Sequence, residues 1–285
     1  MRLDSQRESS DVEERRRMRV SVKGGVGIGA IVMVLVAIYF GFDPSMVLNM
    51  GQSISQSSSQ ESEMASANDQ MGRFVSKVLG STDDTWQKVY KKSGCDYPAP
   101  KLVLFRGHAN TPYGTDQAAL GPFYCPWGKN VYIDLAFCDE MKNLFNAPYD
   151  FTQAYVIAHE AGHQVQNLMG TSDKVQQARK SARNEVQANQ YSLRLDLQSD
   201  CYMSARAHHA DGAKRTLEPG DVEEAMRAVS VIGDDAFQKQ AQGYAFLDIF
   251  THGTSKQRMR WFNQDLKVGV VNKCGKFSAS NVITA

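Results

Sequence analysis

The chain has 285 residues, of which 42% are hydrophobic and 22% charged, and its formal net charge is +1. This length provides one good-sized core, or two small ones, once any tails are removed. A nearly neutral chain lacks the basic field that bulk binding to nucleic acid requires, so we expect no nucleic-acid partner.

The N-terminal region divides into a basic and an apolar segment. Residues 1–23 hold a cluster of Arg and Lys, whereas 24–72 contain neither. The segment 24–42, GGVGIGAIVMVLVAIYFGF, carries no charge and would span about 28 Å as a helix, close to the hydrocarbon thickness of a bilayer.

The alternatives for residues 24–42 are a buried core helix and a cleaved signal peptide. A core helix would have a polar face, which is missing here, and the end YFGFDPSM is a poor cleavage site. We therefore predict a single-pass transmembrane anchor. The basic tail 1–23 is expected in the cytoplasm, which places the C-terminal part outside it.

The stretch 51–70 is rich in Ser and Gln and has no hydrophobic period, so residues 43–70 are predicted to form a flexible linker. One folded domain is expected over 71–285. Its first part, 73–94, suggests two helices broken at Gly80–Ser81. KLVLFRG predicts a strand, and GPFYCPWGKNVYIDLAF predicts strand, turn and strand.

The rest of the pattern is helical. Helices are predicted over Phe151–Met169, over 172–209 as one long helix or two abutting ones, over Asp221–Val231, and over 255–268. The fold class is therefore α+β: the transmembrane helix plus a mainly helical domain with a small antiparallel or mixed sheet.

The helix over 151–169 contains His159-Glu160-Ala161-Gly162-His163, a His-Glu-x-x-His motif. On a helix the two imidazoles project from one face within reach of one metal ion, and Glu160 can reach a metal-bound water without being a ligand. A chance match in this chain is well below about one in a hundred. The motif predicts a zinc site with Glu160 as general base.

A catalytic zinc needs a third protein ligand, for which RLDLQSDC offers Asp196 and Asp200. They are four apart, so the first can bind zinc while the second accepts a hydrogen bond from a ligand histidine. A solvated acidic pair is the alternative. Glu185 is a rival ligand about 16 Å away along a continuous helix, so it and Asp196 cannot bind the same ion.

The segment FTHGTSKQRMRWF places His252 before a helix that carries Arg258. Either side chain beside the zinc could donate to the oxyanion that forms during hydrolysis. The spacing fits a capping loop with Trp261 and Phe262 in the core equally well.

Taken together, the chain resembles the bacterial neutral zinc metallopeptidase family of YpfJ-like, membrane-anchored proteins. The stretches that carry the resemblance are GPFYCP, VYIDLAF, AHEAGHQVQNL, LDLQSDC, GDVEEA, IGDD and FTHGTSKQRMRWF. That family is similar in turn to gluzincins of the CAAX-prenyl-protease type, which implies a zincin-like domain.

The resemblance implies roles for named residues. By this resemblance the zinc ligands are His159, His163 and Asp196. Glu160 becomes the catalytic base, and Asp200 becomes the residue that supports a ligand without binding the metal. His252 and Arg258 become the group that stabilises the transition state. The family usually has Glu at position 196, so this ligand is one methylene shorter here. Among the five cysteines, Cys201 with Cys274 is the preferred disulfide, and Cys125 is left for Cys138 or Cys95.

We therefore expect a zinc-dependent peptidase that hydrolyses a peptide or protein substrate, anchored in the bacterial inner (cytoplasmic) membrane with its domain on the periplasmic or extracytoplasmic side. The alternative is a non-catalytic envelope binding or scaffold protein that retains a degenerate zinc site. The shorter Asp196 favours this alternative.

Overall fold

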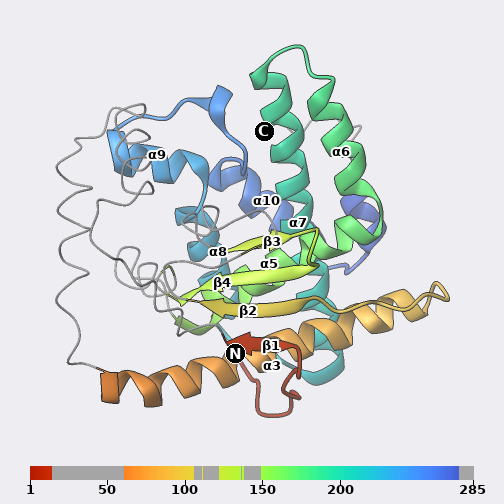
Figure 1. The fold of residues 1–285 in the computed structure, drawn as a ribbon, viewed down its shortest axis with the longest axis vertical. Helices are drawn as coiled ribbons and strands as arrows, with labels where there is room; N and C mark the ends of the chain where they lie inside the picture. Colours follow the sequence, from red (N-terminus) through yellow and green to blue (C-terminus); the bar gives the residue numbers. More distant parts are fainter. Residues whose placement is uncertain (15–60, 106–110, 112–121, 136, 138–148, 276–285) are drawn as a thin grey trace.

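The computed structural model describes residues 1–14, 61–105, 111, 122–135, 137 and 149–275. Within them the fold is α+β and mainly helical, with a small mixed sheet (Figure 1). The α-helices are α3 (Glu61–Lys91), α5 (Tyr149–Leu168), α6 (Thr171–Lys180), α7 (Glu185–Lys214), α8 (Asp221–Val231), α9 (Asp234–Gln242) and α10 (Ser255–Leu266). Two short 3₁₀ helices, η3 (Leu247–Ile249) and η4 (Val271–Gly275), follow α9 and α10.

The sheet consists of β1 (Val12–Glu14), β2 (Lys101–Phe105), β4 (Asn130–Asp134) and β3 (Phe123–Cys125), in that order. β1, β2 and β4 are parallel, and β3 is antiparallel to β4. The strand over KLVLF and the strand–turn–strand after it are thus confirmed, with β4 ending before LAF. β1 was not predicted.

Side chains alternate between the two faces of the sheet, as the two-residue period of a strand requires. The larger core cluster joins one face of the sheet to α3 and α5, with Leu102 and Ile133 from strands and Val78 and Ile157 from helices. Val103 and Tyr132 belong to a second, smaller cluster with Phe105 and Cys125. The sheet thereby supports α5, the helix that carries His-Glu-x-x-His.

Three predicted helices are confirmed: α8 has the predicted bounds, and α5 and α10 differ from theirs by one or two residues at an end. The region 172–209 forms two helices, because Asn184 begins a new one by accepting a hydrogen bond from the backbone of Gln187 at 2.9 Å. α9 was not predicted as a separate element.

Two predictions about α3 are wrong. This helix begins at Glu61, inside the predicted linker, and it continues through Gly80 and Ser81 without a break. Gly80 instead allows the backbone at Arg7 to pack closely against α3, since a Cβ at Gly80 would lie 2.5 Å from the carbonyl oxygen of Arg7. Glu, Met and Ala in residues 61–66 favour helix, which explains the earlier start.

Residues 1–14 do not form a free tail. Leu3 is buried in the larger core cluster, and Arg7 forms an ion pair with Asp84 at 2.7 Å. Ser9 exchanges two hydrogen bonds with Ser76 of α3, at 2.8 and 3.0 Å. The N-terminal part of the predicted tail is therefore packed on the domain, with β1 as the edge strand beside β2.

No helix in the described part of the chain has the length and apolarity needed to cross a membrane. The predicted anchor 24–42 and residues 43–60 of the predicted linker lie outside the described residues. The preferred disulfide, Cys201–Cys274, is present, while Cys95 and Cys125 are free cysteines and Cys138 is outside the described part.

Candidate metal centre

The site is built where α5 and α7 cross. Gly162, between the two motif histidines, faces Ser199 of α7, and a Cβ on this glycine would lie 2.3 Å from the Ser199 hydroxyl oxygen. Any larger residue would hold the helices apart. This close approach brings Asp196 and Asp200 of α7 to the face of α5 that carries His159 and His163.

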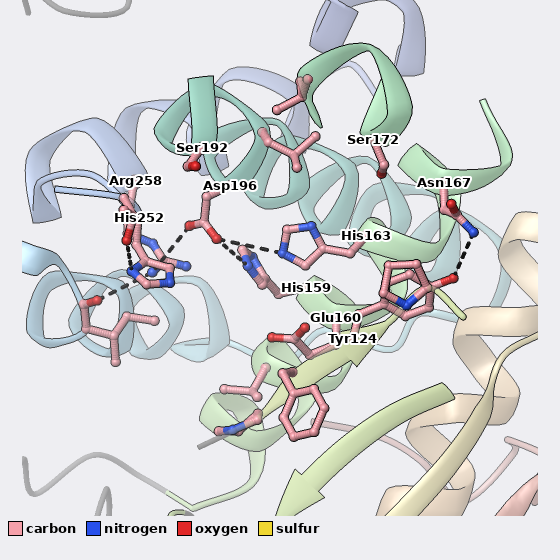
Figure 2. Close-up of a pocket in the computed structure, with 18 of the residues that line it drawn as sticks. Tyr124, His159, Glu160, His163, Asn167, Ser172, Ser192, Asp196, His252 and Arg258 are labelled. Atoms are coloured by element: carbon pink, nitrogen blue, oxygen red, sulfur yellow. Dashed lines mark hydrogen bonds and ion pairs between the residues drawn. The ribbon is translucent and has the colours of Figure 1, made fainter. Parts of the chain in front are cut away.

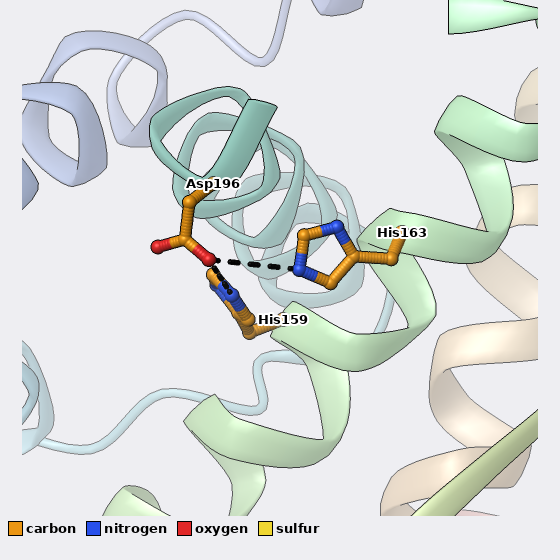
Figure 3. A group of neighbouring side chains, drawn as sticks. All are labelled: His159, His163 and Asp196. Atoms are coloured by element: carbon orange, nitrogen blue, oxygen red, sulfur yellow. Dashed lines mark hydrogen bonds and ion pairs between the residues drawn. The ribbon is translucent and has the colours of Figure 1, made fainter. Parts of the chain in front are cut away.

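The ligand atoms of His159, His163 and Asp196 all lie within 4.8 Å of one another (Figure 3). Asp196 Oδ1 is 3.3 Å from His159 Nε2 and 3.7 Å from His163 Nε2. A tetrahedral zinc with bonds of about 2.0–2.1 Å has ligand–ligand edges of roughly 3.3–3.4 Å. The three atoms therefore have the spacing and chemistry of three zinc ligands, and the shorter acid at position 196 reaches far enough.

The second carboxylate oxygen of Asp196 also bears on metal binding. Its Oδ2 atom is buried and accepts no hydrogen bond from the described residues, and it faces Arg258 Nη1 at 3.7 Å. Burial raises the pKa of Asp196, but His159 and Arg258 lower it more, which holds it well below its usual range. A buried, ionised and under-satisfied carboxylate suits a cation.

Asp200 fixes the orientation of His159. Its Oδ1 lies 2.9 Å from His159 Nδ1, and an ionised carboxylate can only accept, so Nδ1 is the donor. Nε2, 3.3 Å from Asp196 Oδ1, is then the ring nitrogen available to bind a metal once its proton is released. The sequence prediction that Asp200 supports a ligand histidine has the geometry it requires.

Asp200 is itself fully buried and paired. Arg258 donates to both of its oxygens at 3.0 Å, and the hydroxyl of Tyr155 donates to Oδ1. Burial raises the pKa of Asp200, but Arg258 and His159 lower it more. Arg258 also donates to the Tyr155 oxygen at 3.1 Å. The guanidinium therefore acts behind the ligands, although it also reaches the cleft wall.

The three ligands open into a cleft of about 990 Å³. Glu160, which follows the first ligand and is 7% exposed, is part of its wall. In Figure 2, Asp196 lies between the two histidines on one side and His252 with Arg258 on the other. Tyr124 of β3, Asn167 and Ser172 also line the cleft.

His252 is held at the cleft by Asp234, the first residue of α9. Asp234 Oδ2 accepts hydrogen bonds from the backbone N–H groups of Thr251, His252 and Gly253, at 2.8, 2.7 and 3.0 Å. Asp234 Oδ1 accepts from His252 Nδ1 at 3.1 Å, so His252 Nε2 is left free of that contact. The side chain of His252 is 58% exposed.

Glu185, the rival ligand, is the first residue of α7 and is exposed. It does not line the cleft, and α7 is continuous between it and Asp196. The structure therefore brings Asp196, not Glu185, to the histidines.

Sequence reasoning missed Tyr155 and the contribution of Asp234. Tyr155 is four residues before His159 and thus on the same face of α5, a spacing that could have indicated it. Asp234 lies in the IGDD stretch, one of the stretches that carry the family resemblance, but its contacts with residues 251–253 cross 17 to 19 positions in the sequence. Such a long-range contact leaves no local pattern.

The comparisons with known proteins agree with this geometry. The family model described as putative neutral zinc metallopeptidase matches residues 1–277. The chain belongs to this family. Its relatives include the uncharacterized protein YpfJ of Escherichia coli K12, which is 41% identical over an alignment of 292 residues that covers 98% of this chain and 100% of the relative.

A second relative is the uncharacterized protein Rv2575 of Mycobacterium tuberculosis H37Rv. It is 34% identical over 220 residues, which cover 74% of this chain and 73% of the relative. No solved structure matches the chain. The family and the His159–His163–Asp196 triad together identify Zn²⁺ as the metal.

Proposed function

We propose that the protein is a zinc metallopeptidase that hydrolyses peptide bonds in the cleft beside α5. The observation that carries the proposal is the triad of His159, His163 and Asp196 at zinc-ligand spacing, with Glu160 in the adjoining cleft wall. The family supports a peptide or protein substrate.

When bound, zinc supplies a Lewis acid that polarises the attacked carbonyl and lowers the pKa of a water. Glu160 removes the proton from the attacking water on its carboxylate and then delivers it to the leaving amine. His252 donates from Nε2 to the developing oxyanion as the imidazolium, which keeps a proton on both ring nitrogens while Nδ1 donates to Asp234. Burial lowers the pKa of His252, but Asp196 and Asp234 raise it more, which favours this form. Arg258 keeps Asp200 ionised and aligned rather than touching the substrate, because it donates to Asp200, to Tyr155 and to the carbonyl oxygen of Ile232.

An extended substrate is proposed to pair with β3. β4 does not lie at the edge of the sheet, because it is paired with both β2 and β3. Among the described strands β3 lies at the edge opposite β1, and its residues Phe123 and Tyr124 line the cleft. A strand at the edge of a sheet can bind an extended peptide backbone, here beside the metal site.

The test compares the wild-type chain with Glu160→Gln and with the control Glu185→Gln. We expect all three to bind zinc, and Glu160→Gln to lose hydrolysis of a casein or peptide-library substrate by about 10²–10⁴-fold, the usual worth of general base catalysis. Glu185→Gln should keep it. A zinc-loaded wild-type chain that cleaves nothing across a range of pH would support the scaffold alternative instead.

Membrane attachment through residues 24–42 is also part of the proposal, supported by the uncharged 19-residue segment and the basic residues before it. These charges favour an extracytoplasmic domain. That orientation requires residues 1–14 to leave the domain, because they cannot pack on it from across a bilayer. The packing of β1 beside β2 thus provides a direct test of the orientation.

A further inference from the structure

The second ligand histidine has a support of its own, separate from Asp200. Gln166 lies three residues after His163 on α5 and has no exposed surface. Its Oε1 is 2.8 Å from His163 Nδ1, and its Nε2 is 2.6 Å from the carbonyl oxygen of Leu195, the residue before Asp196. The same Nε2 is 2.9 Å from Gln198 Oε1.

The chain of hydrogen bonds continues from Gln198 to the C-terminal part of the domain. Gln198 Nε2 donates to the carbonyl oxygen of Cys274 at 3.0 Å. Cys274 lies in η4 and is joined by a disulfide to Cys201 of α7. A continuous path thus runs from His163 through two buried amides to a backbone group that a covalent bond holds beside α7.

The directions of these hydrogen bonds are determined by the two backbone carbonyls. A carbonyl can only accept, so the amide group that faces Leu195 must be the NH₂ of Gln166, and the one that faces Cys274 must be the NH₂ of Gln198. Gln166 therefore presents its oxygen to His163. Nδ1 of His163 must be the donor, and Nε2, which lies 3.7 Å from Asp196 Oδ1, is the ring nitrogen on the side of the metal site.

We propose that Gln166 and Gln198 are positioning residues that orient His163 for the metal, and that the Cys201–Cys274 disulfide holds the far end of this path. The inference rests on the proposed zinc site but not on peptidase activity. Without Gln166 the Nδ1 atom of His163 loses the hydrogen bond that fixes the orientation of the ring. The ring is then free to rotate away from the metal, and the metal binds more weakly.

The test measures zinc affinity by chelator competition and the visible absorption of the Co²⁺-loaded full-length protein, which reports ligand geometry. Gln166→Leu removes the acceptor for His163 and should lower zinc affinity about 10–100-fold and alter the Co²⁺ spectrum. Gln166→Glu keeps an acceptor for Nδ1 and should restore part of both. Gln198→Leu, which leaves Gln166 in place, should have a smaller effect in the same direction.

Gln164→Leu is the matched control. Gln164 is on the same helix and is equally buried, but its hydrogen bonds go to Tyr124 and to the carbonyl oxygen of Pro98. We expect this variant to lose stability while zinc affinity and the Co²⁺ spectrum stay at wild-type values. A folded Gln166→Leu variant with wild-type affinity and spectrum would overturn the proposal.

The disulfide is tested with the double variant Cys201→Ser, Cys274→Ser. We expect its zinc affinity to fall in the same direction as that of Gln198→Leu, because the Cys274 carbonyl is no longer held beside α7. Unchanged zinc affinity in a folded double variant would overturn the part assigned to the disulfide. A wild-type chain that binds no zinc would contradict the proposed function itself, which is a distinguishable result.

Discussion

Asp200 accepts a hydrogen bond from His159 at 2.9 Å while Arg258 donates to both of its oxygens at 3.0 Å. One fully buried carboxylate thus orients a metal ligand and neutralises a buried cation. The pairing means that the orientation of His159 and the stability of the α7–α10 contact depend on the same side chain. A substitution of Asp200 therefore tests both effects at once, which a substitution of His159 or of Arg258 does not.

Asp200→Asn is expected to lower zinc affinity about 10–100-fold, because the neutral amide holds the His159 tautomer less firmly. It should also destabilise the fold, since Arg258 is left as a buried charge without its full partner, a change that costs about 3–5 kcal/mol when one partner is removed. Zinc affinity and urea denaturation measure the two effects. Asp83→Asn, at another buried aspartate, is the control and should leave zinc affinity unchanged.

The choice between Asp196 and Glu185 gives a second prediction. Asp196→Ala should abolish stoichiometric zinc, because two histidines alone leave the site short of a ligand. Glu185→Ala should bind zinc as the wild type does. Metal analysis of the purified full-length proteins decides the matter, and zinc retained in Asp196→Ala but lost in Glu185→Ala would reverse the assignment.

The helix that carries the two histidines could be predicted from sequence, because the residues that indicate it are close together in the chain. His159 and His163 share a face through the period of the helix, and Asp196 and Asp200 do so on α7. The meeting of these two faces depends on Gly162, whose role requires knowledge of what packs against it. A glycine inside a predicted helix indicates only that the helix is less stable there or that another segment packs closely against it.

The wrong predictions share a different cause. Gly80 and Ser81 have the composition of a helix break, yet Arg7 packs against that glycine and the helix continues. The three-residue strand β1 precedes a run of arginines and has no alternation long enough to identify it. Both features depend on residues 1–14 packing against α3 and β2, a contact between segments about 60 to 90 positions apart that no local pattern reveals.

Zinc binding is predicted to release a proton from His159. Burial lowers the pKa of this imidazole in the metal-free protein, but Asp196 and Asp200 raise it more, to about 10. Since zinc needs the free lone pair of Nε2, zinc affinity should increase with pH up to that value. Calorimetry at neutral pH in two buffers of different ionisation enthalpy measures the release. Identical heats in both buffers would contradict the prediction.

The same pKa predicts how the metal-free protein responds to pH. A raised folded-state pKa contributes stability that is fully present below the unfolded value of 6.5. This contribution is lost as pH rises toward about 10. The contribution of His159 should therefore make the metal-free chain unfold at a lower temperature at pH 9 than at pH 6. With zinc bound the trend should weaken, because His159 is then neutral throughout.

The position of residues 1–14 leads to the last prediction. Val12 and Leu102 face each other in the parallel register of β1 and β2. Neighbouring strands lie about 4.7–4.9 Å apart, and a disulfide needs Cα atoms about 4.4–6.8 Å apart, so cysteines at both positions can be cross-linked. A chain inserted with its N-terminus in the cytoplasm and its domain outside has a bilayer between the two cysteines. We expect the disulfide to form in the detergent-solubilised double variant Val12→Cys, Leu102→Cys, and not in intact membranes.

The single variants Val12→Cys and Leu102→Cys control for pairing with native cysteines, of which Cys95 is exposed. A Val12–Leu102 cross-link in intact membranes would place β1 and the metal centre on one side and would overturn the extracytoplasmic orientation. Its absence in detergent as well would contradict the packing of β1 on β2. The two measurements separate the orientation of the chain from the order of its sheet, because only the first depends on a membrane.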